Sequence, residues 1–341
     1  MTTTELAKTM QAAWYEQQGA VNNVIQYGEM PIHEPKTGEV RIKVSASGVN
    51  PSDTKSRSGW GGITMPFPRV IPHQDGAGVI ESVGEEVPSS RLGERVWIYE
   101  AQRGQAFGTA AEFVVVKSDR AIALPENTSF AEGACLGVPA MTAHRCVFAD
   151  GAVKRQTILV TGGAGAVGYY AIQLAKWGGA TVLTTVSRPE QAEVAQTAGA
   201  DYIINYKTED VVQRIQEITG AEDGRGIDRV VDVNFTANLP MTSVVIRPNG
   251  VITSYSSGNP DDRPALPILD LQLNNVTIRL VLVYTMPDEA KQMAIHDITA
   301  ALEAGALRHN IAQRFSLSEV AAAHQAQDSG EMIGKAIIEI T

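Results

Sequence analysis

The stretch that decides the fold runs from residue 157 to residue 168 and reads TILVTGGAGAVG. Its first five residues, Thr157–Thr161, form a compact apolar run that is typical of a buried strand. The glycine turn Gly163–Gly168 follows with the spacing Gly-x-Gly-x-x-Gly, and the helix-forming run Tyr169–Trp177 comes next. A strand, a turn of this spacing and a helix, in this order, predict a site for the pyrophosphate of a dinucleotide.

Each glycine of this turn has an expected task. Gly163 would make the tight turn, Gly165 would let the backbone approach the pyrophosphate, and Gly168 would let the helix pack closely on the strand. The helix N-terminus would present free N–H groups and its positive dipole end to the phosphates. A glycine-rich turn without a ligand is the alternative, and the order of the flanking elements argues against it. The residues expected to hold the pyrophosphate are Gly163, Ala164, Gly165, Ala166, Val167 and Gly168.

The residues after the next expected strand favour NADPH over NADH. A site for NADH usually has an Asp or Glu about 20 residues past the motif, where the carboxylate binds the ribose 2′-hydroxyl. Here Ser187 and Arg188 stand 19 and 20 residues after the turn. A hydroxyl and a guanidinium would bind a 2′-phosphate, whereas a carboxylate would repel it. Tyr206 or Lys207 could close the same pocket, and an ordinary solvated charge is the alternative for Arg188.

Strands and helices alternate through the second half of the chain, and this rhythm predicts a parallel, doubly wound sheet. The late apolar run Val276–Tyr284 reads as a strand at the edge of that sheet. Because such edges tend to be covered, we expect the run to pair with its copy in a homodimer. The other expected strands are 157–161, 180–186, 201–206, 229–233 and 250–254, and the expected helices are 169–177, 189–198, 209–218 and 288–303.

The first part of the chain, residues 12 to 125, reads instead as short strands punctuated by Gly and Pro. The runs 39–45, 76–83 and 111–116 are examples. Short strands at this spacing predict a small β-barrel or sandwich. The closing run Lys335–Ile340 is expected to rejoin this region as a further strand.

Composition excludes several classes of protein. The formal net charge of −10 argues against nucleic acid or an anionic membrane as partner. The two cysteines, Cys135 and Cys146, read as small buried hydrophobes in a reducing compartment. No apolar run approaches the roughly 20 residues of a membrane span, and Met1–Gln11 lacks the apolar core of a signal peptide. We therefore expect a cytoplasmic protein without a membrane partner.

Several different short motifs are distributed along nearly the whole chain. Besides the glycine turn they are SGVNPSD at 47–53, DGAGVI at 75–80, GERV at 93–96, GTAAEF at 108–113, PAMTAH at 139–144 and the closing Gly334-Lys335. In this order they resemble the zinc-independent quinone oxidoreductases, the ζ-crystallin group of the medium-chain dehydrogenase/reductase superfamily. The resemblance implies an α/β protein with two domains and the cofactor between them. A GroES-like β-barrel catalytic domain would cover residues 1–132 and 305–341, and a doubly wound Rossmann NADPH-binding domain residues 133–304.

The resemblance also bears on zinc. Zinc-dependent relatives carry a cysteine where this chain has Asn50–Asp53, a His-Glu pair where it has His73-Gln74, and a cluster of four cysteines. Only His73 matches a ligand position, and one ligand cannot hold a tetrahedral metal. We therefore expect no metal, with His73 as a packed or hydrogen-bonded loop residue.

Family roles carried over residue by residue give the remaining site. Asn50 and Thr142 would border the nicotinamide, and Lys335 would close the cofactor cleft. Ser187, Arg188 and Tyr206 would read the 2′-phosphate. The ribose and nicotinamide would be lined by Asn234, Ser254, Tyr255, Ser256, Leu282, Val283 and Tyr284.

Without zinc, the oxyanion that develops during hydride transfer needs hydrogen-bond donors from side chains. The candidate donors are Asn50, Thr142, Lys55 and Tyr255 or Tyr284. A conjugated acceptor spreads its negative charge, so we expect an NADPH-dependent reductase of a quinone or another α,β-unsaturated carbonyl. Many quinone oxidoreductases have a tyrosine where this chain has Lys55. This difference argues against a preference for quinones over other acceptors. The alternatives are an NADPH-dependent enone or enoyl double-bond reductase and an NADPH-binding protein with a structural, crystallin-like role.

Overall fold

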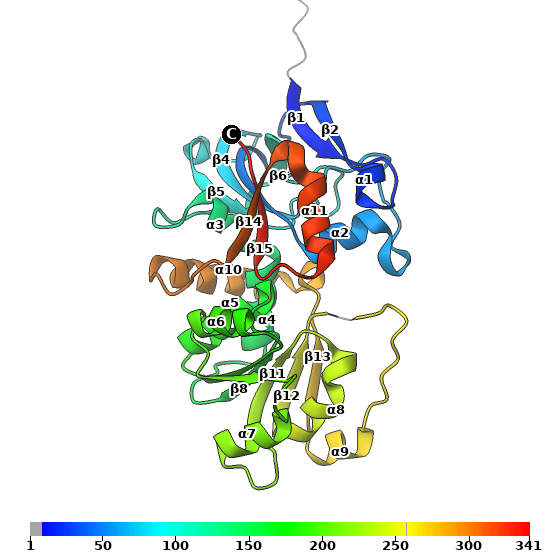
Figure 1. Ribbon diagram of the computed structural model, residues 1–341. Coiled ribbons are helices and arrows are strands. Elements are labelled where there is room, and N and C mark those ends of the chain that lie inside the picture. The colour runs from blue at the N-terminus through cyan, green and yellow to red at the C-terminus, as the bar shows by residue number, and fades with distance from the viewer. Residues whose placement is uncertain (1–8, 257) are drawn as a thin grey trace, which may run out of the picture. The chain divides into compact units, whose positions relative to one another are not determined.

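The computed structural model describes residues 9–256 and 258–341, which form two compact units (Figure 1). The first unit comprises the described residues up to Val138 together with Ile311–Thr341, and the second comprises Pro139–Asn310. The expected domain bounds, 1–132 with 305–341 and 133–304, stay a prediction. The backbone N–H of Val138 donates to the Asp75 carboxylate at 2.8 Å, which ties the segment before it to the first unit.

A six-stranded sheet lies at the centre of the second unit. Its order is β10-β9-β8-β11-β12-β13, and all neighbours are parallel. The chain adds β9 and β10 on one side of β8, and then β11, β12 and β13 on the other side. This strand order is that of dinucleotide-binding sheets. The doubly wound sheet is therefore confirmed. The strands are β8 (Thr157–Thr161), β9 (Thr181–Val186), β10 (Tyr202–Asn205), β11 (Ile227–Asp232), β12 (Ile246–Ser254) and β13 (Thr277–Leu280).

Helices follow the strands of this sheet, and one apolar residue from each of five strands packs in its core. Leu159, Leu183, Ile204, Val230 and Ile252 are all fully buried there. The helices are α4 (Gly137–Phe148, which crosses the boundary between the units), α5 (Ala166–Trp177), α6 (Pro189–Thr197), α7 (Val211–Thr219), α8 (Phe235–Val245), α9 (Ile268–Leu273) and α10 (Asp288–Glu303).

The edge strand β13 is shorter than the sequence suggested. The expected run Val276–Tyr284 is a strand only over Thr277–Leu280, and Val283–Thr285 form a short 3-10 turn, η4. The cause is the neighbouring strand: Leu280 pairs with Ser254, where β12 ends. The hydrogen-bonded pairing of β13 therefore ends where β12 ends, although the apolar sequence continues beyond that point.

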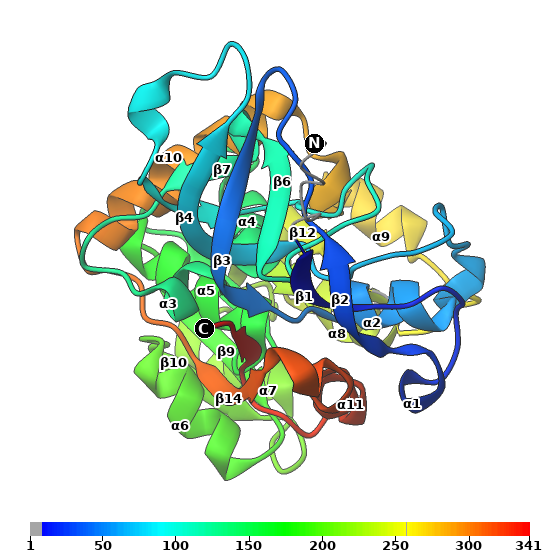
Figure 2. The ribbon, with the colours of Figure 1, turned by 90° about the horizontal axis from the view of Figure 1, so that it is seen from above.

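The first unit is built around a seven-stranded sheet. The path β14-β15-β3-β4-β5-β7 is completed by β6, which pairs with β3, and Figure 2 shows β3 between β4 and β6. The last strand, β15, pairs antiparallel with β3, as the closing run of the sequence predicted. The strands are β3 (Glu39–Gly48), β4 (Asp75–Val83), β5 (Arg95–Ile98), β6 (Phe113–Lys117), β7 (Ala121–Ala123), β14 (Ile311–Ser316) and β15 (Lys335–Glu339).

A separate hairpin and several short helices complete this unit. Apolar residues of β3, Val40, Ile42 and Val44, lie in the same core cluster as Val96 of β5 and Ile338 of β15. The remaining elements are the hairpin β1 (Thr9–Trp14) and β2 (Gln26–Pro31), the helices α1 (Val21–Val24), α2 (Pro51–Ser58), α3 (Phe130–Gly133) and α11 (Val320–Ser329), and the 3-10 turns η1 (Trp60–Gly62), η2 (Ser89–Arg91), η3 (Ser118–Arg120) and η5 (Leu317–Glu319). None of the helices formed by residues 9–256 and 258–341 has the length and hydropathy to cross a bilayer.

Candidate active site

The glycine turn of the second unit joins β8 to α5 and is packed so tightly that two of its glycines admit no side chain. A Cβ on Gly163 would lie 2.1 Å from Thr184 Oγ1, and a Cβ on Gly168 would lie 2.4 Å from the Gly162 carbonyl oxygen. The left-handed residue of the turn is Gly162, with φ +67°, rather than Gly163. Gly163 is required instead because β9, which carries Thr184, passes so close to it.

The middle glycine of the turn faces open space. Gly165 is exposed, and a Cβ there would find only the Gly162 carbonyl oxygen, at 3.4 Å. It is also the N-cap of α5. A helix N-terminus leaves its first N–H groups without intrahelical partners, and Gly165 has no side chain to satisfy them. The turn therefore offers N–H groups at an open surface where an anion can approach, and Ala164, Ala166 and Val167 belong to the same turn.

The residues expected to read a 2′-phosphate come together at the ends of two neighbouring strands, β9 and β10. Arg188 is exposed at the N-terminus of α6, and the Tyr206 N–H donates to the Val186 carbonyl at 3.1 Å. Lys207 Nζ lies 5.3 Å from the centre of the Tyr206 ring. The Ser187 hydroxyl donates to Gln191 Oε1 at 2.9 Å. Two cations and two hydroxyls thus share this edge of the sheet, and the role of Ser187 toward a 2′-phosphate stays a prediction.

A buried carboxylate that sequence reasoning missed links the ends of β8, β11 and β12. Asp232 accepts hydrogen bonds from Thr161 Oγ1 at 2.7 Å, from Asn238 Nδ2 at 2.6 Å and from Ser254 Oγ at 3.4 Å. Burial raises the pKa of the Asp232 carboxyl, and these donors oppose the rise. Its position at the end of the expected strand 229–233 was the available signal, because ligands bind beyond the carboxyl ends of such strands. Ser254, an expected lining residue, is thereby fixed to Asp232.

The neighbouring lining candidates occupy loops at the same strand ends. Asn234 caps α8 by accepting the Ala237 N–H at 3.3 Å, and the Tyr255 N–H donates to the Asp232 carbonyl at 3.2 Å. Burial raises the pKa of the Tyr255 phenol well above its ordinary range, and the nearby Cys146 and Asp232 add to the rise. The phenol therefore stays protonated and can donate a hydrogen bond. The remaining candidates are half-buried Ser256, exposed Leu282, buried Val283, half-buried Tyr284 and buried Thr142 on α4.

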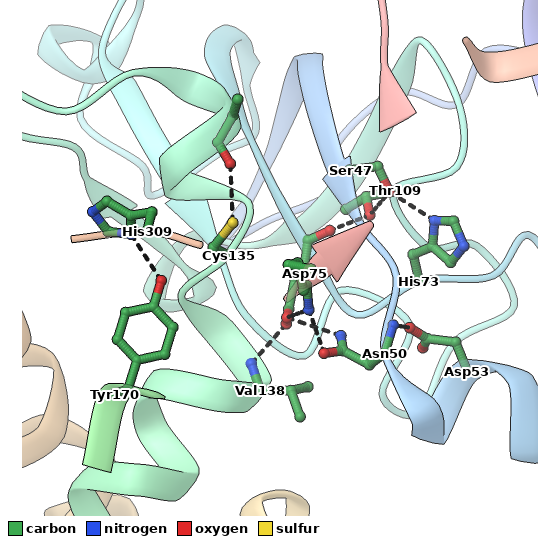
Figure 3. Close-up of polar contacts among 12 residues, drawn as sticks. Ser47, Asn50, Asp53, His73, Asp75, Thr109, Cys135, Val138, Tyr170 and His309 are labelled. Atoms are coloured by element: carbon green, nitrogen blue, oxygen red, sulfur yellow. Dashed lines mark hydrogen bonds and ion pairs between the residues drawn. The ribbon is translucent and has the colours of Figure 1, made fainter. Parts of the chain in front are cut away.

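A buried cluster in the first unit joins three elements through the Asp75 carboxylate (Figure 3). Asn50, the N-cap of α2, donates from Nδ2 to Asp75 Oδ2 at 2.8 Å. The Lys335 ammonium at the start of β15 lies 3.2 Å from the same oxygen and donates to Asn50 Oδ1. The other carboxylate oxygen accepts the Val138 N–H, and a Cβ on Gly137 would lie 2.2 Å from it. All three side chains are at most 4% exposed.

The electrostatics of this cluster are those of a buried ion pair. Burial raises the pKa of the Asp75 carboxyl, while Lys335, Asn50 and the Val138 N–H oppose the rise. A desolvated carboxylate of this kind is costly unless its lone pairs are satisfied, which these partners do. The sequence placed Asn50 and Lys335 in the site but not Asp75, the residue that brings them together. The expectation that Lys335 closes a cofactor cleft stays a prediction, since its ammonium here belongs to this buried pair.

Two further residues of α2 differ in environment. Burial raises the pKa of the Asp53 carboxyl to about 7, the charge of Asp75 adds to the rise, and the Asn50 N–H bond opposes it. Lys55 does not join the Asp75 cluster but lies 4.0 Å from the centre of the Trp60 ring. Burial lowers the pKa of the Lys55 ammonium. The role of Lys55 as a donor to substrate stays a prediction.

His73 is fully buried and hydrogen-bonded through both ring nitrogens. Nδ1 lies 2.8 Å from Ser47 Oγ, and Nε2 lies 2.8 Å from His324 Nε2. This agrees with its interpretation as a hydrogen-bonded loop residue. Within residues 9–256 and 258–341, no group of three or more His, Cys, Asp or Glu side chains could hold a metal ion. Cys135 and Cys146 are buried free thiols, as the sequence predicted.

Two protein-family models match the chain. Residues 36–126 match the alcohol dehydrogenase GroES-like domain, and residues 166–300 match the domain described as zinc-binding dehydrogenase. The chain has two cysteines, too few for the four-cysteine cluster of the zinc-dependent relatives.

Relatives match over most of their length. A quinone oxidoreductase of Sus scrofa is 31% identical over 299 residues, which cover 87% of each chain. A 2-haloacrylate reductase of a Burkholderia species is 28% identical over 337 residues, which cover 96% of this chain and 98% of the relative. The solved structure of a mycobacterial protein complexed with NADPH superimposes with a TM-score of 0.82 at 25% identity, covering 97% of this chain and 99% of that one. The chain belongs to the zinc-independent quinone oxidoreductase group of the medium-chain dehydrogenase/reductase superfamily.

Proposed function

We propose that the protein is an NADPH-dependent reductase that transfers a hydride to a quinone or another conjugated carbonyl without zinc. The observation that carries the proposal is the glycine turn. Gly163 and Gly168 leave no room for a Cβ, while Gly165 opens the N-terminus of α5 to a ligand. This is a cradle for a pyrophosphate. The mycobacterial structural relative in complex with NADPH supports the identity of the cofactor.

The residues of the second unit bind the two ends of the cofactor. The turn Gly163–Gly168 holds the pyrophosphate, and Arg188 with Tyr206 and Lys207 holds the 2′-phosphate. These two cations favour NADPH, because a guanidinium pairs well with phosphate and no carboxylate stands at positions 187 and 188 to repel it. The strand ends near Asp232, with Asn234 and Tyr255, orient the ribose and the nicotinamide.

NADPH supplies the hydride, and the protein supplies orientation, exclusion of water and hydrogen-bond donors for the oxygen that gains charge. Asn50 Nδ2 carries two N–H groups, of which Asp75 takes one. The second is the donor that we assign to the acceptor oxygen. Thr142 and Tyr255 stay candidate donors of the second unit, and the raised pKa of Tyr255 keeps its proton in place.

Reduction of a carbon–carbon double bond is the second candidate. The Burkholderia relative named 2-haloacrylate reductase, which matches nearly the whole chain, favours it. A conjugated alkene and a quinone make the same demand on the protein, since each delivers negative charge to a carbonyl oxygen. Product analysis separates them: a quinone gives a hydroquinone, whereas a 2-enone gives a saturated ketone.

The test is steady-state oxidation of NADPH by the full chain with 1,4-quinones, 2-enones and simple ketones. We expect turnover with one or both conjugated classes, little with plain ketones, and a lower KM for NADPH than for NADH. Gln196→Ala, which changes no charge at an exposed position of the same helix α6, is the matched control for the cofactor preference. Tight NADPH binding without turnover of any acceptor would reject both reactions and favour a structural role.

We further propose that the protein is a homodimer formed through β13. This strand is at the edge of the parallel sheet, and its Leu280 is 70% exposed. Leu282, just beyond it, and Leu273 of α9 are also exposed. An apolar edge of this kind pairs readily with its own copy about a two-fold axis. Sedimentation as a monomer at micromolar concentration would reject the dimer.

The two buried free thiols fit a reducing compartment, and we propose a cytoplasmic location. Fractionation of the producing cell tests it, and recovery of the protein outside the cytoplasmic fraction would reject it.

A further inference from the structure

A series of buried side chains, each hydrogen-bonded to the next, runs through the first unit. It begins at Arg57 on α2 and ends at the backbone carbonyl of Asp75 at the start of β4, and we call this series the file. Arg57 Nε lies 3.3 Å from His324 Nδ1, and His324 Nε2 lies 2.8 Å from His73 Nε2. These three side chains are at most 2% exposed. At its outer end the file is anchored by Asp328 of α11, whose carboxylate lies 2.5 Å from the Arg57 guanidinium.

Two hydroxyls continue the file beyond His73. His73 Nδ1 lies 2.8 Å from Ser47 Oγ, which lies 2.7 Å from Thr109 Oγ1. Thr109 Oγ1 in turn donates to the Asp75 carbonyl at 2.6 Å (Figure 3). Ser47 and Thr109 are fully buried. Water cannot supply alternative partners to groups enclosed in this way, so each member depends on the next.

The groups at the two ends of the file determine which atom carries each hydrogen-bonding proton within it. A guanidinium can only donate, so His324 Nδ1 must accept, and the proton of the neutral His324 ring is on Nε2. That N–H donates to His73 Nε2, which places the proton of the neutral His73 ring on Nδ1. From the other end, the Asp75 carbonyl can only accept, so Thr109 donates to it, Ser47 donates to Thr109, and His73 Nδ1–H donates to Ser47. The two derivations give the same arrangement, with all bonds pointing from Arg57 to Asp75.

The backbone at His73 adopts a conformation that is rare for residues other than glycine. Its φ is +81°, in the left-handed region that side chains with a Cβ rarely adopt. Such a conformation persists where the surrounding structure over-determines it, and it is frequent at functional sites. The His73 carbonyl also accepts the Thr109 N–H at 3.2 Å, so both the backbone and the ring of His73 are bonded to neighbouring segments.

The file ends where the Asp75 cluster begins. His73 stands two residues before Asp75, whose carboxylate holds Asn50, Lys335 and the Val138 N–H. We propose that His73 and His324 are positioning residues: their directional pair fixes the segment that carries Asp75 and thereby the orientation of the Asn50 amide. The inference rests on the proposed function in giving Asn50 a role toward the acceptor. The geometry of the file does not depend on it.

The histidine pair is neutral in this arrangement. Burial lowers the pKa of both imidazoles. The charge of Arg57 adds to the effect on His324, and the charge of Lys335, with that of His324 whenever His324 is protonated, adds to the effect on His73. A protonated ring would place two N–H donors face to face, or one against Arg57, and would break the file.

The first test reads the protons directly. In ¹⁵N spectra of the full chain at neutral pH, with the two rings assigned by His→Gln variants, we expect His324 as the Nε2–H tautomer and His73 as the Nδ1–H tautomer. An imidazolium or the opposite tautomer at either position would overturn the proposal. This outcome does not depend on any enzymatic activity.

The second test asks whether the pair acts on Asn50. His324→Met removes the donor to His73 at similar volume, whereas His324→Gln restores an N–H donor. Gln325→Met, an exposed neighbour on α11, is the matched control. We expect the side-chain amide signals of Asn50 to shift in His324→Met and to return toward the wild-type position in His324→Gln. Unchanged Asn50 signals in a folded His324→Met would overturn the proposal.

Kinetics then separate the inference from the proposed function. We expect kcat for the acceptor to fall about tenfold or more in His324→Met, because small displacements of a positioned donor are costly, with the Kd for NADPH unchanged. Wild-type kcat in His324→Met with shifted Asn50 signals would reject the catalytic part of the proposal. A wild-type protein that turns over no acceptor would reject the proposed function and leave both spectroscopic tests standing.

Discussion

Acidification should destabilise the first unit through His324, and the size of the effect follows from the structure. The imidazole is fully buried, and burial together with the charge of Arg57 lowers its pKa from 6.5 to about 3. Below pH 6.5, His324 therefore binds a proton in the unfolded chain but stays unprotonated in the folded chain. Stability rises with pH wherever the unfolded state binds more protons, so this contribution is complete above pH 6.5 and is lost as the pH falls below it.

The expected loss is about 1.4 kcal/mol for each pH unit between 6.5 and the folded pKa of about 3, since one unit of pKa corresponds to about 1.4 kcal/mol. Other groups titrate in the same range. His73 acts in the same direction, because burial, followed by the charges of His324 and Lys335, lowers its pKa well below its ordinary value. Asp53 acts in the opposite direction, because its pKa is raised to about 7 and its folded state binds the extra proton. The pH dependence of the wild type alone is therefore a sum of opposing parts.

A comparison of the wild type with His324→Gln isolates the contribution of His324. Asp53, Arg57 and Asp328 are present in both proteins, and their contributions largely cancel, so the difference reports His324 together with its effect on the pKa of His73. Between pH 7.5 and 5.5 the free energy of unfolding of the wild type should fall by about 1.4 kcal/mol more than that of the variant. Urea unfolding followed by tryptophan fluorescence is the assay, because Trp14, Trp60 and Trp97 all lie in the first unit. Equal pH dependence in the two proteins would refute the reasoning.

Three further predictions concern the cofactor, the buried ion pair and the dimer. Arg188→Glu should reduce the preference for NADPH over NADH by about tenfold or more in kcat/KM, since one ion pair to phosphate becomes a repulsion; an unchanged ratio would remove Arg188 from the site. Lys335→Met should cost about 3–5 kcal/mol in urea unfolding by leaving Asp75 buried without its counterion, and the double variant with Asp75→Asn should recover part of that loss; equal stability of wild type and Lys335→Met would mean that the pair is not buried in solution. Leu280→Asp should shift the sedimenting species from dimer to monomer, and a dimer that persists would place the interface elsewhere.

Local sequence was sufficient for the parallel sheet and the glycine turn. Alternation of apolar strands with helices predicted β8 to β12, because each element is decided by its own periodicity and by the turns at its ends. The edge strand β13 was overestimated for the opposite reason. Its length depends on where the neighbouring β12 ends, which no local pattern in Val276–Tyr284 records.

The buried polar groups could not be predicted in the same way, because their partners are remote in the chain. His73 and His324 are separated by 251 residues, and Asp75 and Lys335 by 260. Each of these residues is unremarkable within its own segment: Asp75 opens an apolar strand, and His324 lies in an alanine-rich run. These residues come together only because β15 pairs with β3 and α11 packs against β15 and α2. The motifs located Asn50 and Lys335 but not the carboxylate between them.

The most direct test of the central claim is single-turnover oxidation of NADPH by 1,4-benzoquinone, and in parallel by a 2-enone, with purified full-length protein and a metal chelator present. We predict that one NADPH is consumed for each acceptor molecule reduced, at a rate well above that of the uncatalysed reaction and unaffected by the chelator. Oxidation no faster than without protein for both acceptors, or activity that the chelator abolishes, would contradict a zinc-independent NADPH-dependent reductase.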